Sequence, residues 1–152
     1  MRVTAKSDYA VRAMIELASA SPGMPMKAEG IVERQKIPWR FLLNILADLR
    51  IGKLVESRRG ADGGYWLARP AADIRVADVI RAVEGPLVDV RGIPPEGLVY
   101  PEPAAALRDV WLATRGAVRS ILETTTLADI VAGNLPAQVT DALTLPGALE
   151  QR

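Results

Sequence analysis

The 152-residue chain contains no cysteine and no histidine. Without cysteine it can form neither a disulfide framework nor a thiol redox switch. Without histidine it lacks the most common general acid–base of enzymes, so catalysis would depend on carboxylates or serine alone, and no triad pattern is recognisable. We therefore expect a recognition protein rather than an enzyme, with no cofactor and no bound metal.

Long hydrophobic runs are also missing. Apolar residues make up 49% of the chain and charged residues 24%, as in ordinary soluble globular proteins. The longest apolar stretches are only a few residues, which is too short to span a membrane. The first residues, MRVTAKSDYAVRAM, lack the apolar segment and cleavage site of a signal peptide. These features predict a cytoplasmic protein with one domain core and no membrane partner.

A large excess of charge of one sign is absent as well, since the formal net charge is only +1. The distribution of charge is nevertheless uneven. Residues 1–75 hold 13 Lys and Arg against 8 Asp and Glu, whereas residues 76–152 hold 6 against 10. This split suggests that the basic first half faces an anionic partner, although chance also produces such asymmetry.

Apolar residues at helical spacing predict three helices in the first 52 residues. Thr4 or Ser7 can cap the first helix, and the breaker SPGMP separates it from the second. Pro38 suits the first position of the third helix, which Gly52 ends. Two short strands around a glycine-rich turn then predict a β-hairpin. The predicted elements are helices over 4–20, 27–35, 38–51 and 74–84, and strands over 54–58 and 65–68.

The second half contains a proline-rich stretch and a long helix. Five of the eleven prolines fall in residues 86–103, which predicts an extended connector. A 4,3 spacing of apolar residues predicts a helix over 104–125, about 33 Å long at about 1.5 Å per residue. Thr126 and Asp129 form a capping-box pattern for a short last helix. We expect a head over 1–85, a connector over 86–103, a helical region over 104–134 and a disordered tail over 135–152.

The third predicted helix has an unusual outer side. Arg40 and Asn44 stand there, and these residue types pair with guanine O6/N7 and adenine N6/N7 in the major groove. Trp39 and Leu43 stand beside them. The alternative interpretation is an ordinary solvated helix face, but such a face gains nothing from large exposed apolar groups. The stripe expected to be buried comprises Phe41, Leu42, Ile45, Leu46 and Leu49, and the outer side comprises Trp39, Arg40, Leu43, Asn44 and Ala47.

The turn of the predicted hairpin reads RRGADGG over residues 58–64. Its three glycines allow positive φ and close approach of the backbone to a ligand. Arg58 and Arg59 would present guanidinium groups that suit phosphates or the electronegative minor groove. Two solvated arginines on a surface hairpin are the alternative. Helix, short turn, helix and hairpin in this order nevertheless favour a winged helix-turn-helix that binds double-stranded DNA.

The chain resembles the Rrf2-type winged-helix transcriptional regulators. The GxxGGY hairpin after the helix pair is the specific signal of this resemblance, which covers most of the chain. It implies a mainly α fold with a small β-hairpin wing and a long dimerisation helix, in a homodimeric repressor or activator; we expect a repressor. The segments that carry it are TAKSDYAVRAM at 4–14, IVERQKIPWRFLLNILADLR at 31–50, LVESRRGADGGYWLARPA at 54–71, IRVADVIRAVEGPL at 74–87, LRDVW at 107–111 and TLADI at 126–130.

The resemblance also implies which surfaces bind. The third helix of each protomer would enter a major groove, and the long helix would pair with its copy in the partner. A two-fold dimer implies a pseudo-palindromic operator with half-sites about 34 Å, or a multiple of that, apart. The expected DNA contacts are Lys6, Tyr9, Lys27, Lys36, Pro38, Trp39, Arg40, Leu43, Asn44, Arg58, Arg59 and Gly60. The expected dimer contacts are Leu107, Val110, Trp111, Thr114, Val118, Ile121 and Leu122.

One branch of this family senses nitric oxide, redox state or iron–sulfur status through a cluster held by three cysteines in the connector. The present chain departs from that branch, because residues 91–105 contain no cysteine and carboxylates alone do not hold such a cluster. We therefore expect a cluster-free regulator whose effector the sequence does not identify. The rival hypothesis is a winged-helix module that docks a partner protein through exposed Trp39 and Leu43.

Overall fold

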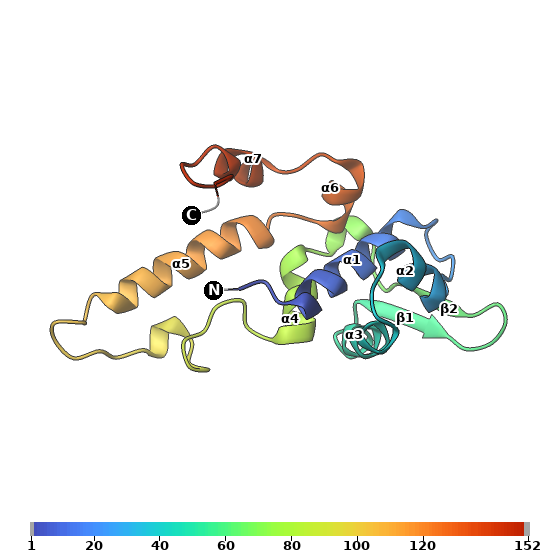
Figure 1. Ribbon diagram of the computed structural model, residues 1–152, viewed down its shortest axis with the longest axis horizontal. Helices are drawn as coiled ribbons and strands as arrows, with labels where there is room; N and C mark the ends of the chain where they lie inside the picture. Colours follow the sequence, from blue (N-terminus) through green and yellow to red (C-terminus); the bar gives the residue numbers. More distant parts are fainter. Residues whose placement is uncertain (1, 151–152) are drawn as a thin grey trace.

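Seven α-helices, two short 3-10 helices and one two-stranded antiparallel sheet follow one another along residues 2–150, the part of the chain that the computed structural model describes (Figure 1). Residues 1, 151 and 152 lie outside it. This mainly helical fold with a small hairpin confirms the predicted fold class, and none of its helices has the length and apolar character of a membrane span. The elements are α1 (Ala5–Ser19), α2 (Ala28–Gln35), α3 (Trp39–Ile51), β1 (Val55–Arg58), β2 (Gly64–Leu67), η1 (Ala71–Asp73), α4 (Val76–Glu84), η2 (Pro95–Gly97), α5 (Leu107–Leu122), α6 (Leu127–Ala132) and α7 (Ala137–Leu143).

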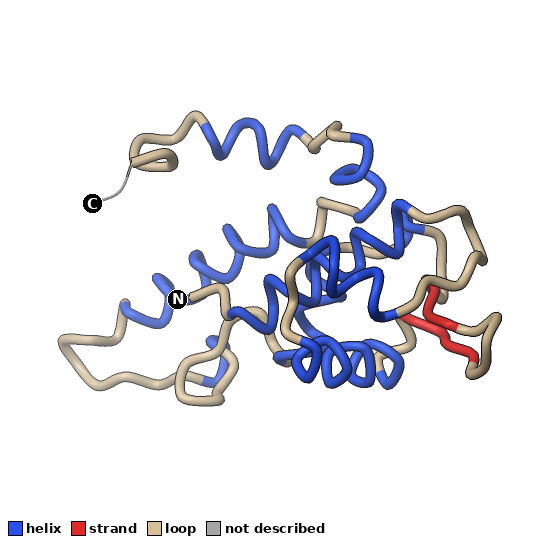
Figure 2. The backbone as a smooth tube through the Cα atoms, turned by 45° about the vertical axis from the view of Figure 1, so that its right-hand side comes forward, coloured by secondary structure: helices blue, strands red, loops and turns tan. Residues whose placement is uncertain are grey.

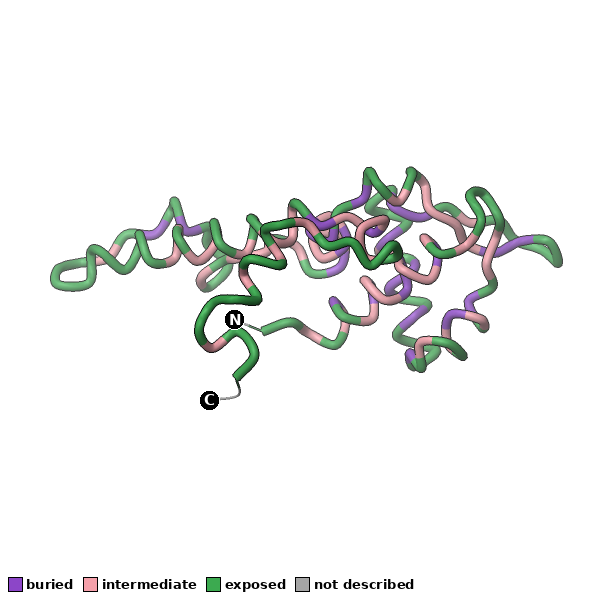
Figure 3. The backbone as a smooth tube through the Cα atoms, turned by 90° about the horizontal axis from the view of Figure 1, so that it is seen from above, coloured by how far each residue is buried: buried purple, intermediate pink, exposed green. Residues whose placement is uncertain are grey.

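The apolar core lies where α1 packs against α3 and α4. Met14, Leu46 and Val79 are fully buried and represent the three helices. In Figure 3 the buried residues gather in the head formed by α1 to α4, whereas α5 is drawn as intermediate and exposed. Removal of these side chains from water is the main source of stability of the head.

Local chemistry sets the ends of the first three helices. Thr4 caps α1, because its Oγ1 accepts the backbone N–H three residues later at 3.0 Å. Lys36 ends α2 with a left-handed φ of 54°, which turns the chain towards α3. Pro38 is the N-cap of α3, so this helix begins at Trp39, one residue later than predicted. Gly52 ends α3 as expected.

A polar cluster joins α1 to α2. The Glu16 carboxylate accepts hydrogen bonds from Arg34 Nε at 2.7 Å and from Gln35 Nε2 at 2.5 Å, and Arg12 Nε donates to Gln35 Oε1 at 3.1 Å. Burial raises the pKa of Glu16, but the hydrogen bonds from Gln35 and Arg34 outweigh burial and hold this pKa below its ordinary value. The ionised carboxylate therefore holds the first two helices together.

The hairpin of β1 and β2 projects from the edge of the head (Figure 2). Met26, in the loop before α2, extends this sheet by exchanging two backbone hydrogen bonds with Tyr65, both 2.9 Å long. An added Cβ at Gly64 would lie 2.7 Å from the Met26 carbonyl oxygen, so the close approach requires glycine. The wing is thus anchored to the loop that leads into α2.

Two long-range contacts attach the end of α5 to α4. The Val76 N–H donates to the Thr125 carbonyl at 2.9 Å. The Arg81 guanidinium forms an ion pair with the Glu123 carboxylate. Because α4 packs on both α1 and α3, these contacts attach α5 to the whole head.

Helix α5 is shorter than predicted. It spans Leu107–Leu122, 16 residues or about 24 Å, instead of 104–125 and about 33 Å. Turns over 102–106 delay its start. At its end the chain becomes extended so that Thr126 forms a β-bridge with Arg75. A tertiary contact, which periodicity does not reveal, therefore ends this helix.

Two short helices follow α5. The Thr126 Oγ1 accepts the Asp129 N–H at 3.1 Å and the Asp129 Oδ2 accepts the Thr126 N–H at 2.8 Å, which confirms the capping box at the start of α6. Helix α7 (Ala137–Leu143) lies within 135–152, so the prediction of a disordered tail is wrong for this helix. Pro136 precedes it, and α7 contacts α5, a tertiary contact that local sequence does not show.

Candidate nucleic-acid interface

Helix α3 turns one face to the core and the opposite face to solvent. On the solvent face Trp39 is 43% and Leu43 38% exposed, and Arg40 and Asn44 are exposed beside them. Within residues 2–150 the side chains of Arg40 and Asn44 make no hydrogen bond or ion pair. This face therefore presents an unpaired guanidinium and an unpaired amide between two large apolar groups.

Phe41 does not lie where the sequence predicted. We expected it to be buried, but it is 49% exposed. Its ring meets the Tyr9 ring edge-on, with centroids 6.0 Å apart, and the Arg12 guanidinium lies 5.5 Å from the Tyr9 centroid. Residue 41 stands at the margin of the buried stripe, where its ring packs on Tyr9 of α1 but stays half exposed, so the prediction for Phe41 was wrong.

Hydrogen bonds within the protein hold the tip of the wing. Lys27 Nζ donates to the Gly60 carbonyl at 2.9 Å, and Arg58 Nη2 donates to the Asp62 carbonyl at 3.1 Å. Arg59 is exposed, and its side chain has no hydrogen bond or ion pair to any other residue between 2 and 150. Of the two predicted wing arginines, Arg58 therefore uses one of its guanidinium N–H groups within the wing, whereas Arg59 has all of its N–H groups available to a ligand.

A groove of about 370 Å³ separates α3 from the wing. Its basic lining residues outnumber its acidic ones by four to one, with Glu29 as the acidic member. This charge makes the α3–wing groove a favourable place for an anion. Its lining residues are Lys27, Ala28, Glu29, Trp39, Leu43, Arg50, Ser57, Arg58, Arg59, Gly64 and Tyr65.

Of the other predicted DNA contacts in the head, some are exposed and one is paired within the protein. Lys36 and Pro38 are exposed in the turn between α2 and α3. Lys6 Nζ instead donates to the Val83 carbonyl at 2.7 Å and pairs with the Asp48 carboxylate at 2.8 Å. The ammonium group of Lys6 therefore braces α3 and α4 within the head.

Arg50 and Ser57 also line the α3–wing groove, and the sequence analysis did not single them out. Arg50 lies three residues after Ala47 and seven after Leu43, so helical periodicity alone places it on the same exposed face. No comparable signal marks Ser57, because its position depends on how the wing packs beside α3.

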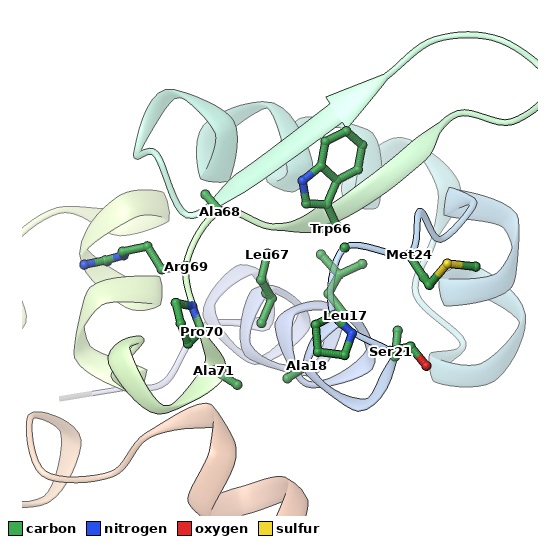
Figure 4. A pocket seen from close by; sticks show the side chains of 13 residues that line it. Leu17, Ala18, Ser21, Met24, Trp66, Leu67, Ala68, Arg69, Pro70 and Ala71 are labelled. Atoms are coloured by element: carbon green, nitrogen blue, oxygen red, sulfur yellow. The ribbon is translucent and has the colours of Figure 1, made fainter.

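A second hollow, of about 440 Å³, lies at the base of the wing (Figure 4). The end of α1, the loop after it and the chain from Trp66 onward line this hollow, and most of the lining is apolar. Trp66 Nε1 donates to Glu56 Oε2 at 3.0 Å across the hairpin. No residue of α3 lines this hollow, so it is separate from the α3–wing groove.

Helix α5 has an apolar stripe but no buried residue. Leu107 is 36% and Val110 53% exposed. The last two turns of this stripe also line an apolar hollow of about 340 Å³ against α4. An amphipathic helix whose apolar stripe is only partly covered is typical of an interface. The other expected dimer residues, all half-buried, are Trp111, Thr114, Val118, Ile121 and Leu122.

Direct contacts fasten the connector to α5. Trp111 Nε1 donates to the Tyr100 hydroxyl at 3.2 Å, and Arg108 Nη2 donates to the Glu96 carbonyl at 3.3 Å. The Glu96 carboxylate forms an ion pair with Arg115. A hydrogen bond from its own backbone, and then the Arg115 contact, lower the pKa of Glu96. Over residues 2–150 no three carboxylates gather in a way that could hold a metal ion.

A helical head with a wing and an exposed α3 defines the class of winged helix-turn-helix regulators. The model of the Rrf2 family, described as an iron-dependent transcriptional regulator, matches residues 3–133. The chain therefore belongs to the Rrf2 family of transcriptional regulators, which confirms the resemblance found in its sequence and the expectation that it is no enzyme.

Known proteins support this assignment at the level of sequence and fold. A helix-turn-helix-type transcriptional regulator of Mycobacterium tuberculosis is 50% identical over 139 residues, which cover 91% of this chain and 86% of that protein. The structure of CymR, the global cysteine regulator of Bacillus subtilis, has a TM-score of 0.75 at 32% identity and covers 88% of this chain and 98% of its own. The structure of T. potens IscR has a TM-score of 0.72 at 32% identity, with 97% and 94% covered.

Proposed function

We propose that this protein is a homodimeric, sequence-specific repressor that binds a pseudo-palindromic DNA site without an iron–sulfur cluster. The proposal rests on two neighbouring surfaces of the head whose polar side chains have no partner within residues 2–150. Trp39 and Leu43 of α3 line the basic groove together with the wing arginine Arg59, and Arg40 and Asn44 are exposed next to them on α3. In a winged helix-turn-helix these two surfaces enter adjacent grooves of DNA.

Base readout is assigned to α3. Arg40 and Asn44 lie one helical turn apart, about 6 Å along the axis, which matches about two base-pair steps of 3.4 Å. Arg40 suits guanine and Asn44 suits adenine. Pro38 offers no side-chain cap, so the first N–H groups of α3 can also bind a phosphate. Trp39 and Leu43 supply apolar contacts to sugars or a thymine methyl group.

Dimerisation is assigned to the apolar stripe of α5. Figure 1 shows that the C-terminal end of α5 adjoins the head and that its N-terminal end reaches away from it. Antiparallel pairing would place Leu107 of one protomer against Leu122 of the other, beside the apolar hollow at α4. Thr114 would then lie close to its own copy at the two-fold axis.

The absence of native cysteine makes this arrangement directly testable. Thr114→Cys should give a disulfide-linked dimer on mild oxidation, because a disulfide needs Cα atoms within about 7 Å of each other. Ser120→Cys, on the opposite side of α5, is the matched control and should stay monomeric on a denaturing gel. Equal cross-linking of both variants would contradict the proposed stripe.

The residues of this chain do not fit an iron–sulfur cluster. Such clusters are held by thiolates, sometimes with histidine, and the chain has neither. We propose that the contacts of Trp111 with Tyr100 and of Arg115 with Glu96 keep the connector in place by themselves. DNA binding should therefore be the same in air and in the presence of a metal chelator. Loss of binding in chelator would refute cluster-free operation.

Selection of bound sites from random duplex DNA tests the proposal as a whole. We expect enrichment of a two-fold related sequence with half-sites about 34 Å, or a multiple of that, apart. Arg40→Ala should reduce affinity by about 1–3 kcal/mol for each half-site and relax the preference at one base pair of each half-site. Equal weakening on every sequence would show that Arg40 contacts a phosphate, and no enrichment at all would overturn the proposal.

A module that docks a partner protein is the second candidate. The exposed rings of Trp39 and Phe41 favour it, because such aromatic groups often anchor protein interfaces. The two candidates differ in their dependence on salt. Binding to duplex DNA must weaken steeply as salt rises, whereas a protein-docking module should show weak and salt-insensitive association with DNA.

A further inference from the structure

In the DNA binding proposed above, on which this inference rests, one DNA strand passes between α3 and the wing. In B-form DNA one sugar–phosphate strand separates a major groove from the neighbouring minor groove. If α3 occupies the major groove and the wing the minor groove, this strand must run along the space between α3 and β1. Residues that line this space would therefore meet phosphates rather than bases.

Two adjoining hollows fill that space. The first is the α3–wing groove, and the second, of about 590 Å³, continues towards the C-terminal end of α3 beside Ala47 and Ile51. Arg50 and Ser57 line both hollows. The two hollows therefore adjoin at these residues, with Arg50 on the α3 side and Ser57 on the β1 side, and together they are called the channel below.

We propose that Arg50, with Ser57 opposite it, binds the phosphate strand between the two grooves. Arg50 is exposed in the last turn of α3, and among residues 2–150 its guanidinium has no hydrogen-bond or ion-pair partner. A planar guanidinium can give two parallel hydrogen bonds to phosphate oxygens. The half-buried Ser57 adds one hydroxyl donor from the other wall.

Contacts of the wing with the head fix the width of the channel, and a carboxylate limits how far a phosphate strand can extend along it. The hydrogen bond from Lys27 to the Gly60 carbonyl, and the bridge between Met26 and Tyr65, hold the wing at a fixed distance from the head. In the second hollow the Glu56 carboxylate accepts a hydrogen bond from Trp66 and would repel a phosphate. The bound strand should therefore leave the channel before it reaches Glu56.

The inference predicts a contact that positions the protein and does not read sequence. Arg50→Gln should weaken binding to specific and random duplexes by the same factor. The slope of log K against log salt should fall by about 0.9 per lost phosphate contact, hence by about 1.8 for a dimer that carries the change twice. Arg50→Lys should restore most of the slope because it restores the charge.

The experiment measures salt slopes for the full-length wild type, Arg50→Gln and Arg50→Lys on the selected site and on a random duplex. Arg91→Gln removes the same charge from the exposed connector and is the control. Ethylation interference should show one phosphate, between the bases read by α3 and the minor groove under the wing, whose modification inhibits the wild type but not Arg50→Gln. Thermal melts establish that each variant is folded.

The outcomes separate this inference from the proposed function. An unchanged slope for Arg50→Gln, or a changed preference at a single base pair, would overturn the assignment of Arg50 while DNA binding itself stands. A wild type without specific, salt-dependent binding would overturn the proposed function first. Ser57→Asp gives an independent check, because a carboxylate in the channel should abolish binding to both duplexes.

Discussion

The shape of the wing turn should control how well Arg59 binds, and Gly63 is the residue that tests this. Its N–H donates to the Gly60 carbonyl at 3.0 Å. An added Cβ would lie 2.1 Å from the Arg58 carbonyl oxygen and 2.7 Å from the Arg59 carbonyl carbon, whereas real Cβ contacts are not shorter than 3.0 Å. In Gly63→Ala the backbone at residues 58 and 59 must therefore move by about 1 Å.

A shift of this size misplaces the Arg59 guanidinium. A hydrogen bond to a charged group contributes about 1.5–3 kcal/mol, so its loss should reduce DNA affinity by at least about tenfold. The core of the head lies elsewhere, so the variant should remain folded at room temperature. Ala61→Ser, in the same exposed turn, is the control and should bind like the wild type.

Fluorescence anisotropy on labelled operator DNA can measure wild type, Gly63→Ala, Arg59→Ala and the double variant. If both changes act through the same contact, the double variant should lose little more than either single variant. Fully additive losses would show that Gly63 acts by another route. Wild-type affinity in Gly63→Ala would refute the argument that the glycine positions Arg59.

Four further predictions concern the dimer, the helix ends and the interior contacts. Val118→Glu places a charge in the proposed apolar seam and should yield monomers in light scattering; a stable dimer would exclude the seam. Thr126→Ala removes the cap of α6 and should lower the free energy of unfolding by about 1 kcal/mol in urea titrations. The pKa of Glu16 is lowered in the folded state, so the ionised Glu16 carboxylate stabilises the folded protein above about pH 4.5. This stabilisation is lost as the pH falls. The urea midpoint of Glu16→Gln should therefore fall less on acidification than that of the wild type. Lys6→Met should lower thermal stability but leave the salt slope of DNA binding unchanged, whereas a lower slope would restore Lys6 as a phosphate contact.

Local patterns were enough to predict several helix ends. The stop at Gly52 and the capping box at Thr126 depend on residues within one turn of each other, so the sequence alone revealed them. For the first helix the sequence offered Thr4 or Ser7 as the cap, and the structure shows Thr4 in this place. Local patterns did not predict the exposure of Phe41. Helical periodicity gives the direction of a side chain, but its burial depends on how the neighbouring helices pack, and Phe41 stays 49% exposed although its ring meets Tyr9 of α1.

Contacts between distant residues account for the remaining differences. The extended chain at Thr126 ends α5 early because it pairs with Arg75, some fifty residues earlier in the sequence. Lys6 looked like a free cation, but its partners Val83 and Asp48 come from two other helices. Ser57 joins the candidate interface only because the wing folds beside α3. None of these pairings has a signal in local composition or periodicity.

The same distant contacts decide how a dimer could be switched without a cluster. Glu123 at the end of α5 is paired with Arg81 of α4, and Lys6 of α1 ties the end of α4 at Val83 to Asp48 of α3. These links form a chain from α5, the proposed dimer helix, to α3, the proposed DNA-reading helix. In the proposed dimer a change in the pairing of the two α5 helices would alter the distance between the two α3 helices, and that distance must match the spacing of the half-sites. A partner or ligand that alters α5 pairing, including one that enters the apolar hollow where α5 meets α4 and the start of the chain, should therefore lower the affinity of the proposed dimer for DNA.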